Sequence, residues 1–107
     1  MRAARLNKRV LIQVQLDTTE NQYGEKIEEW QDLMTVWAGI EPLSGKEFFA
    51  AQERNAELTT RIVIRYRSGL GPFIRFKYQG RTFYPSGQPI DKNSSHEELE
   101  FICHERI

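Results

Sequence analysis

The feature that most constrains this chain is the alternation of apolar and polar residues in short runs along most of its length. In the run 9–16, alternate positions hold Val10, Ile12, Val14 and Leu16. A period of two puts successive side chains on opposite faces of a β-strand, so one face of each run is buried. The same period recurs in 30–41, 58–67, 73–78, 81–84 and 97–105. The pattern predicts six strand regions.

The second run shows how sharply the alternation assigns faces. Met34, Val36, Ala38 and Ile40 share one side, and Trp37 falls on the other. Because the aliphatic face is the one that is buried, we expect the Trp37 ring on the outer surface.

Turn residues separate the runs. Gly80 supplies the positive φ that a tight hairpin needs between 73–78 and 81–84. The polar stretch 17–28, around Tyr23 and Gly24, predicts a long exposed loop or a loose hairpin connection. Residues 85–95 predict another turn-rich loop.

The period changes between the second and third runs. Ser44 and Glu47 fit a capping box, in which the hydroxyl and the carboxylate each satisfy a backbone amide at a helix start. We predict a short helix over 44–57, with Phe48 and Ala51 on one side. Its apolar stripe is short, so we expect partial burial.

Short antiparallel strands of this number favour a small barrel or a two-sheet sandwich. The 107 residues show no internal linker, so we expect a single domain, 1–107.

Bulk charge favours no particular partner. Fifteen basic residues balance fifteen acidic ones, and this zero net charge argues against a dedicated nucleic-acid binder. Zero net charge is still compatible with a local basic patch. The single cysteine, Cys103, excludes an intrachain disulfide and suggests an intracellular product. The basic residues 1–9 lead into an alternating run instead of an apolar segment. We therefore expect neither a signal peptide nor a transmembrane helix.

No pattern supports catalysis. Cys103 and His104 are adjacent and so point to opposite faces of a strand, which argues against a shared metal ion or a nucleophile pair, and His96 stands apart. We expect Cys103 in the core and both histidines on the surface. Residues 69–71 and 44–46 do not fit dinucleotide or phosphate loops. We predict a protein without enzymatic activity, metal or cofactor.

Acidic residues near the C-terminus form no convincing acid/base pair. Glu97, Glu98 and Glu100 are expected to be solvated on an exposed strand face.

Charge is segregated along the chain. The stretches 17–32 and 91–105 are mostly acidic, whereas 58–81 contains no acidic residue and six basic ones: Arg61, Arg65, Arg67, Arg75, Lys77 and Arg81. Our first interpretation is neutralisation between neighbouring strands of one subunit. The second is a head-to-tail subunit contact, and the third is contact with DNA phosphates.

The order of the motifs resembles one known family. The segments that carry the resemblance are 6–13, 23–24, Trp30, 36–38, 40–45, 47–51, 61–67, Pro72, 75–76, Tyr78, 80–84 and 99–103. Together they are similar to the phage head–tail joining, or head closure, proteins over nearly the whole chain. The loop 85–95 departs most, because Gly87 and Pro89 stand where a more regular apolar strand is expected.

The resemblance implies a mainly β fold: a small antiparallel β-barrel of about six strands, with one short helix or long loop between the second and third. It implies a structural protein of the virion neck, present in the host cytoplasm during assembly. There it docks as a ring under the portal and adaptor, closes the packaged head and offers a surface to a tail completion or tail terminator protein. The ring is expected to be dodecameric in the virion and its subunit monomeric when free, with non-specific contact to channel DNA and no membrane association.

In relatives the segment between the second and third main strands reaches toward the channel, and here that segment is 43–58. The alternative, a helix that caps one end of the barrel, stays open. The candidate channel or contact residues of the segment are Ser44, Lys46, Glu47, Phe48, Phe49, Gln52 and Arg54. The six basic residues of 58–81 are the candidate subunit-interface or DNA-facing residues. Two alternatives stay open: a tail-side assembly factor such as a tail terminator, and a nucleic-acid-binding β-barrel.

Overall fold

The computed structural model describes residues 6–16, 19–20, 22–27, 29–54, 56–91 and 94–106. The basic residues 1–5 and Asn55 of the expected helix lie outside these ranges. The long strands are β1 (Lys8–Gln15), β4 (Trp30–Pro42), β5 (Thr60–Arg65), β6 (Ile74–Tyr78), β7 (Arg81–Pro85) and β9 (Glu98–Arg106). The short elements are β2 (Thr19–Glu20), β3 (Lys26–Ile27), β8 (Ile90–Asp91) and the helix α1 (Gly45–Arg54).

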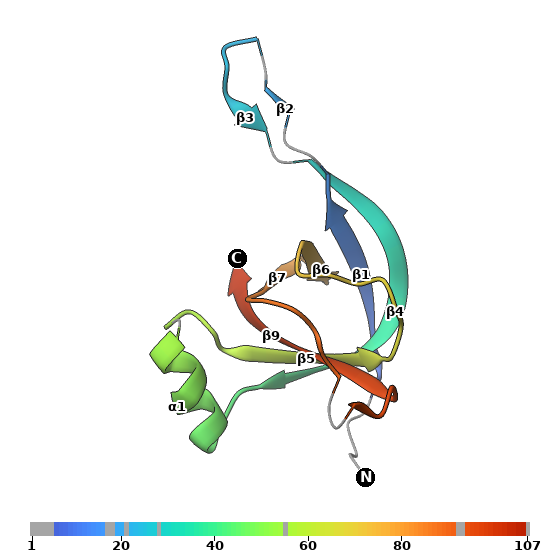
Figure 1. Ribbon diagram of the computed structural model, residues 1–107, viewed down its shortest axis with the longest axis vertical. Coiled ribbons are helices and arrows are strands. Elements are labelled where there is room, and N and C mark those ends of the chain that lie inside the picture. Colours follow the sequence, from blue (N-terminus) through green and yellow to red (C-terminus); the bar gives the residue numbers. More distant parts are fainter. Residues whose placement is uncertain are drawn as a thin grey trace.

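The six long strands form one closed antiparallel barrel. Their order is β5-β4-β1-β6-β7-β9, and pairing of β5 with β9 closes the ring of strands. The six strand regions predicted from the alternation are therefore confirmed, and so is a barrel with one helix between its second and third main strands (Figure 1). Closure leaves each long strand hydrogen-bonded on both sides.

The barrel interior is filled by inward-facing residues from all six long strands. Phe76, Phe83 and Phe101 are at most 1% exposed, and the rings of Phe76 and Phe101 meet edge to face at 4.9 Å. Edge-to-face contact adds to the stabilisation from burial. Trp37 lies on the outer face with 52% of its surface exposed, as predicted.

The β6–β7 hairpin turns through two residues with positive φ, Gln79 (46°) and Gly80 (80°). Two consecutive positive φ angles define the tight turn whose twist matches antiparallel strands. The predicted role of Gly80 is confirmed.

Helix α1 begins where the capping pattern places it but ends earlier than predicted. It stops at Arg54, and Ala56 and Glu57 lie in a turn. Leu58 is only 1% exposed and packs with Leu43 and Ala51, so the chain has to leave the helix to bring Leu58 back. The Gln52 amide donates a hydrogen bond to the Leu58 carbonyl at 2.6 Å and stabilises this turn.

One other segment differs from the sequence expectation in detail, and a second agrees with it. The loop 85–95 contains the two-residue strand β8, which pairs with β9. A strand this short has no room for a recognisable alternation, so the sequence did not reveal it. In the stretch 17–28 the hairpin alternative is confirmed, because Thr19 pairs with Ile27.

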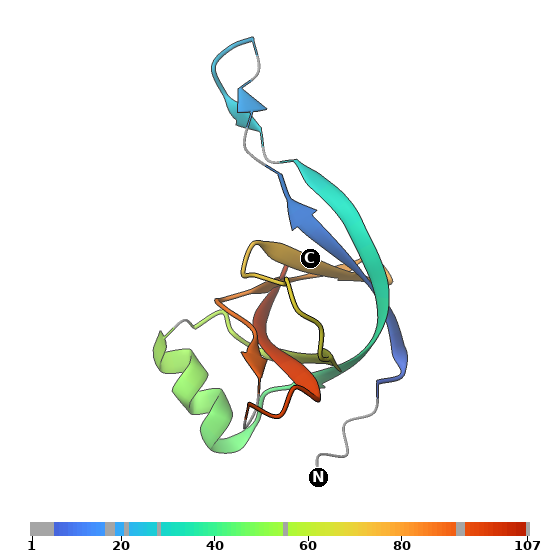
Figure 2. The same ribbon diagram turned by 45° about the vertical axis from the view of Figure 1, so that its right-hand side comes forward.

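This hairpin, β2–β3, stands away from the barrel on the extended ends of β1 and β4 (Figures 1 and 2). We call residues 19–27 the arm. The arm accounts for the elongated shape, whose principal extents are 52 × 29 × 27 Å. Helix α1 lies against the outside of the barrel, remote from the arm (Figure 1).

Candidate interaction surfaces

Arg61, on the outer face of β5, is surrounded by carboxylates from three other elements. Its guanidinium contacts Glu47 of α1, lies 3.4 Å from Glu41 Oε2 of β4 and 3.6 Å from Glu100 Oε1 of β9. The Arg61 side chain is only 17% exposed. These four residues, which we call the Arg61 cluster, join the helix to the barrel from within one chain.

The cluster corrects one expectation. Glu100 was expected to be solvated, yet it is only 8% exposed. Barrel closure places it opposite Val63, which is two residues from Arg61 on the same face of β5. Burial of a carboxylate is tolerated where a cation faces it.

Arg81 is also engaged within the chain. Its guanidinium donates two hydrogen bonds to the Glu105 carboxylate, at 2.7 and 2.8 Å. This bidentate pair raises the pKa of Arg81 and lowers the pKa of Glu105, mainly through the hydrogen bonds. For Arg61 and Arg81 the structure therefore agrees with neutralisation between neighbouring strands.

Arg75 lies on β6, which is across the barrel from β5 and Arg61, and its side chain is among aromatic rings. Its guanidinium stacks 4.3 Å from the Trp30 ring centroid and donates hydrogen bonds to Gln13 at 2.7 Å and to the Tyr84 hydroxyl at 3.1 Å. Lys77, two residues along β6, is half-buried between Leu11 and Thr82 in the strand register. Stacking and hydrogen bonding give Arg75 a structural role on this face.

His104 continues the aromatic face. Its ring stacks on Tyr84 at 5.3 Å, and Arg106 lies 4.8 Å from the same tyrosine ring. His104 is on the outer face as predicted, but it is half-buried and its ring nitrogens are shielded from solvent. His96 is exposed and stacks on Tyr66.

Cys103 is fully buried in the core, as predicted, and burial raises the pKa of its thiol. Cys103 and His104 lie on opposite faces of β9, so they do not form a pair. Among the described residues, no three His, Cys, Asp or Glu side chains are grouped to hold a metal ion. No helix in the described ranges is long and apolar enough to span a membrane.

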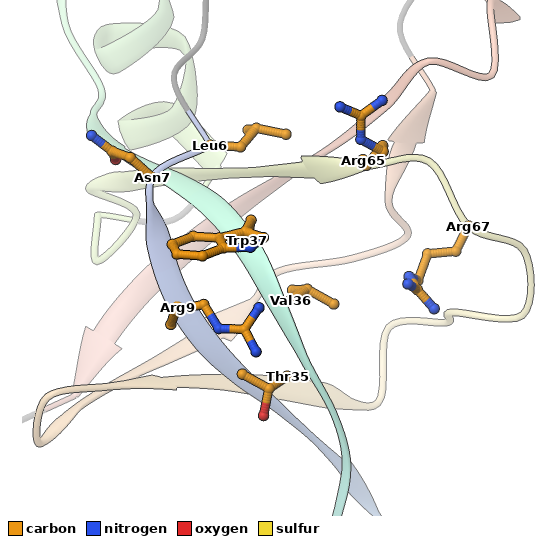
Figure 3. Close-up of a pocket in the computed structure, with 8 residues that line it drawn as sticks. All are labelled: Leu6, Asn7, Arg9, Thr35, Val36, Trp37, Arg65 and Arg67. Atoms are coloured by element: carbon orange, nitrogen blue, oxygen red, sulfur yellow. The ribbon is translucent and has the colours of Figure 1, made fainter.

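Arg65 and Arg67 lie at the other end of β5 from Arg61 and line a surface hollow of about 570 Å³ (Figure 3). We call this cavity the arginine hollow. The described residues that line it are Leu6, Asn7, Arg9, Thr35, Val36, Trp37, Arg65 and Arg67. Arg9 and Trp37 are opposite each other in the β1–β4 register, and the Arg9 guanidinium lies 4.8 Å from the Trp37 ring centroid. Figure 3 shows this stacked pair on one side and the two β5-side arginines on the other.

Sequence reasoning missed Arg9 and Trp37 as members of a site. The outward position of Trp37 was predictable from the alternation. Its neighbours were not, because the register of β1, β4 and β5 is set by tertiary pairing.

The segment 43–58 forms a small satellite core on the barrel. Leu43, Ala51 and Leu58 are buried, and Phe48 packs against them with Ile102 of β9. Phe49 points away and is 69% exposed. Of the predicted contact residues, those with exposed positions are Ser44, Lys46, Glu47, Phe49 and Arg54. Phe48 and Gln52 are used within the chain.

The fold and these surfaces define a class of protein: a small closed β-barrel domain that carries a helix and a hairpin arm outside the barrel. The chain belongs to the phage head completion protein family, whose model matches residues 1–106. The resemblance found in the sequence is thus confirmed, and the chain is a structural protein of the phage head.

Individual relatives agree with this assignment. The chain is 28% identical to head completion protein gp7 of Enterobacteria phage HK97, over 96% of this chain and 95% of that protein. The solution structure of protein SF1141 from Shigella flexneri 2a matches with a TM-score of 0.78 and 34% identity, over 98% and 96% of the two chains. A chain in the virion of a native gene transfer agent particle shares the fold, with a TM-score of 0.62 and 19% identity over 96% and 97% of the chains.

Proposed function

We propose that this protein docks as a ring beneath the portal and adaptor, closes the packaged head and provides the surface to which the tail attaches. Membership of the head completion family supports a role at the head. The closed barrel supports contacts through side chains and attached elements, because each long strand is already paired on both sides.

The observation that carries the docking proposal is the exposed Phe49 on an anchored helix. Three buried residues and the Arg61–Glu47 ion pair hold α1 against the barrel, while Phe49 presents its ring to solvent. Aromatic side chains on rigid elements are typical centres of protein–protein contacts. We assign the exposed side of α1 to the contact with a neighbouring neck component, such as the portal–adaptor ring or the tail.

The test is complementation of a phage lacking this gene by a Phe49→Ala variant. We expect the yield of tailed, infectious particles to fall about tenfold or more, as for the loss of a central contact residue, with folding unchanged because the ring is exposed. Ala50→Ser, the exposed neighbour on the same helix, is the matched control. Normal tail joining by Phe49→Ala would contradict the assignment of α1.

The kind of particle that accumulates when the protein is absent distinguishes head closure from the main alternative, a tail terminator. A head that leaks DNA or lacks a tail supports head closure. Intact heads joined to overlong tails would identify a tail terminator and overturn the proposal.

A further inference from the structure

We propose that the arm of one copy, which lies within the acidic stretch 17–32, docks into the arginine hollow of the next copy, so that subunits join head to tail. This inference rests on the proposed ring and names the contact that would build it. It goes beyond the family assignment because neither surface is defined by the family.

The hollow has the chemistry of a site for an acidic segment. It gathers three guanidinium groups, from Arg9, Arg65 and Arg67, around the half-exposed Trp37 ring. None of the eight described residues that line it is acidic. Guanidinium groups bind carboxylates with charge-assisted hydrogen bonds, and the tryptophan adds an apolar surface for an aromatic partner.

The arm and its base have the complementary composition. Residues 17–32 contain six acidic residues and one basic residue, Lys26. At the described tip, Gln22 to Glu25 are exposed, and Tyr23 is 77% exposed. An exposed tyrosine two residues from the Glu25 carboxylate is the combination that the hollow would accommodate.

The arm cannot occupy the hollow of its own chain. Strand β1 begins at Lys8, beside the hollow, and ends at Gln15, below the arm, and eight extended residues span about 25 Å. Figures 1 and 2 show the arm pointing away from the barrel at that far end. A contact between two different surfaces at opposite ends of a subunit is heterologous, and it closes into a ring when the rotation permits.

Nucleic acid is the other anion that three arginines would attract. The arm is favoured because each copy carries both an acidic stretch, 17–32, and a hollow lined by three arginines, so that the two surfaces of neighbouring copies can match. DNA in the hollow is an outcome that the experiment distinguishes.

The test is disulfide cross-linking between two single-site variants, Tyr23→Cys and Arg67→Cys, one of them carrying a mass tag. The native Cys103 does not interfere, because it is fully buried and its thiol pKa is raised. The mixture is oxidised as concentrated free protein and on DNA-filled, tail-less heads. We expect a mixed dimer several-fold above that from Arg67→Cys with Ala50→Cys, which places the second thiol on α1.

Charge reversal provides an independent second test of the same contact. Because Arg67 is now changed to Glu, the second thiol is placed at Asn7, and the cross-link is measured between Tyr23→Cys and Asn7→Cys. Glu25→Arg alone and Arg67→Glu alone should each lower the yield of this cross-link by about three- to tenfold. The double variant restores opposite charges and should recover it.

Three results decide the proposal. A cross-link no higher than the α1 control, both free and on heads, overturns it. Loss of duplex DNA binding by Arg67→Glu, with cross-linking at the control level, assigns the hollow to DNA and also overturns it. If the cross-link forms but the wild-type protein does not dock on heads, the proposed function fails while the arm contact stands.

Discussion

Arg61 and Arg65 are four residues apart on β5 and face the same side of the sheet, yet they have different surroundings. Arg61 is 17% exposed and faces the carboxylates of Glu41, Glu47 and Glu100. Arg65 is exposed and lines the arginine hollow with Arg67. One end of the strand is covered by α1 and the other end is open.

The difference shows that the elements packed around a strand, and not its own sequence, decide which arginine is buried and paired and which is exposed. Helix α1 brings Glu47 to one end of β5, and barrel closure brings Glu100 beside it. Coulomb attraction is stronger where water is excluded, so the same residue type stabilises the fold at one end and remains accessible at the other.

The largest effect should come from Arg61→Ala. Removing the cation leaves the 8%-exposed Glu100 without its facing guanidinium, and breaking a buried pair costs several kcal/mol. Because the cluster is partly accessible, we expect a loss of about 3 kcal/mol in the free energy of unfolding. Urea denaturation at neutral pH measures it. A loss below about 0.5 kcal/mol, the range of ordinary surface changes, would show that the cluster is not structural.

Arg81→Ala should cost less, under about 1 kcal/mol, because the Arg81 side chain is 47% exposed and the pair is screened by solvent. The folded state lowers the pKa of Glu105, so the pair's contribution is fully present above the unfolded pKa, about 4.5. It is lost as the pH falls through the lower, folded value. Urea denaturation across pH 7 to pH 2 should show a smaller acid-dependent loss in the variant than in the wild type. An identical pH profile in both proteins would contradict this assignment.

Glu47→Gln tests the helix end of the Arg61 cluster alone. Glu47 is 46% exposed, so we expect only about 0.5 kcal/mol of global destabilisation. The local effect should be clearer, because this carboxylate connects α1 to β5. Hydrogen exchange of the α1 amides should accelerate more than that of the barrel amides, whereas uniform acceleration would argue against a local tether.

The smallest effect on stability should come from Arg65→Ala. An exposed residue at a strand end is expected to change the free energy of unfolding by less than about 0.5 kcal/mol. The same urea experiment as for Arg61→Ala provides the direct comparison. A loss comparable with that of Arg61→Ala would mean that the two ends of β5 do not differ as described.

Much of the fold was predictable because it depends on local pattern. The alternation located all six long strands, and it placed Val10 and Ile12 on the buried face of the first one. Cys103 was also expected in the core. The end of α1 was missed because it depends on Leu58, whose burial against Leu43 and Ala51 is a tertiary contact. The choice of a barrel over a sandwich depended on the pairing of β5 with β9, which no local pattern reveals.

The candidate surfaces were predictable only as sets of residues. The basic run in 58–81 was evident, and so was the acidic stretch in 17–32. The division of that basic run was not evident. Arg61 and Arg81 pair within the chain, Arg75 stacks on Trp30, and Arg65 and Arg67 line the hollow.

By itself, the sequence determined which residues face inward, where the chain turns and how charge is distributed along it, since these follow from side-chain periodicity and backbone preferences. Only the tertiary structure decided what each charge meets. Arg61 contacts carboxylates 14 and 20 residues away in the sequence, because strand pairing and the packing of α1 bring them together. The same closure places Glu98 of β9 opposite Arg65 but leaves the Arg65 side chain exposed.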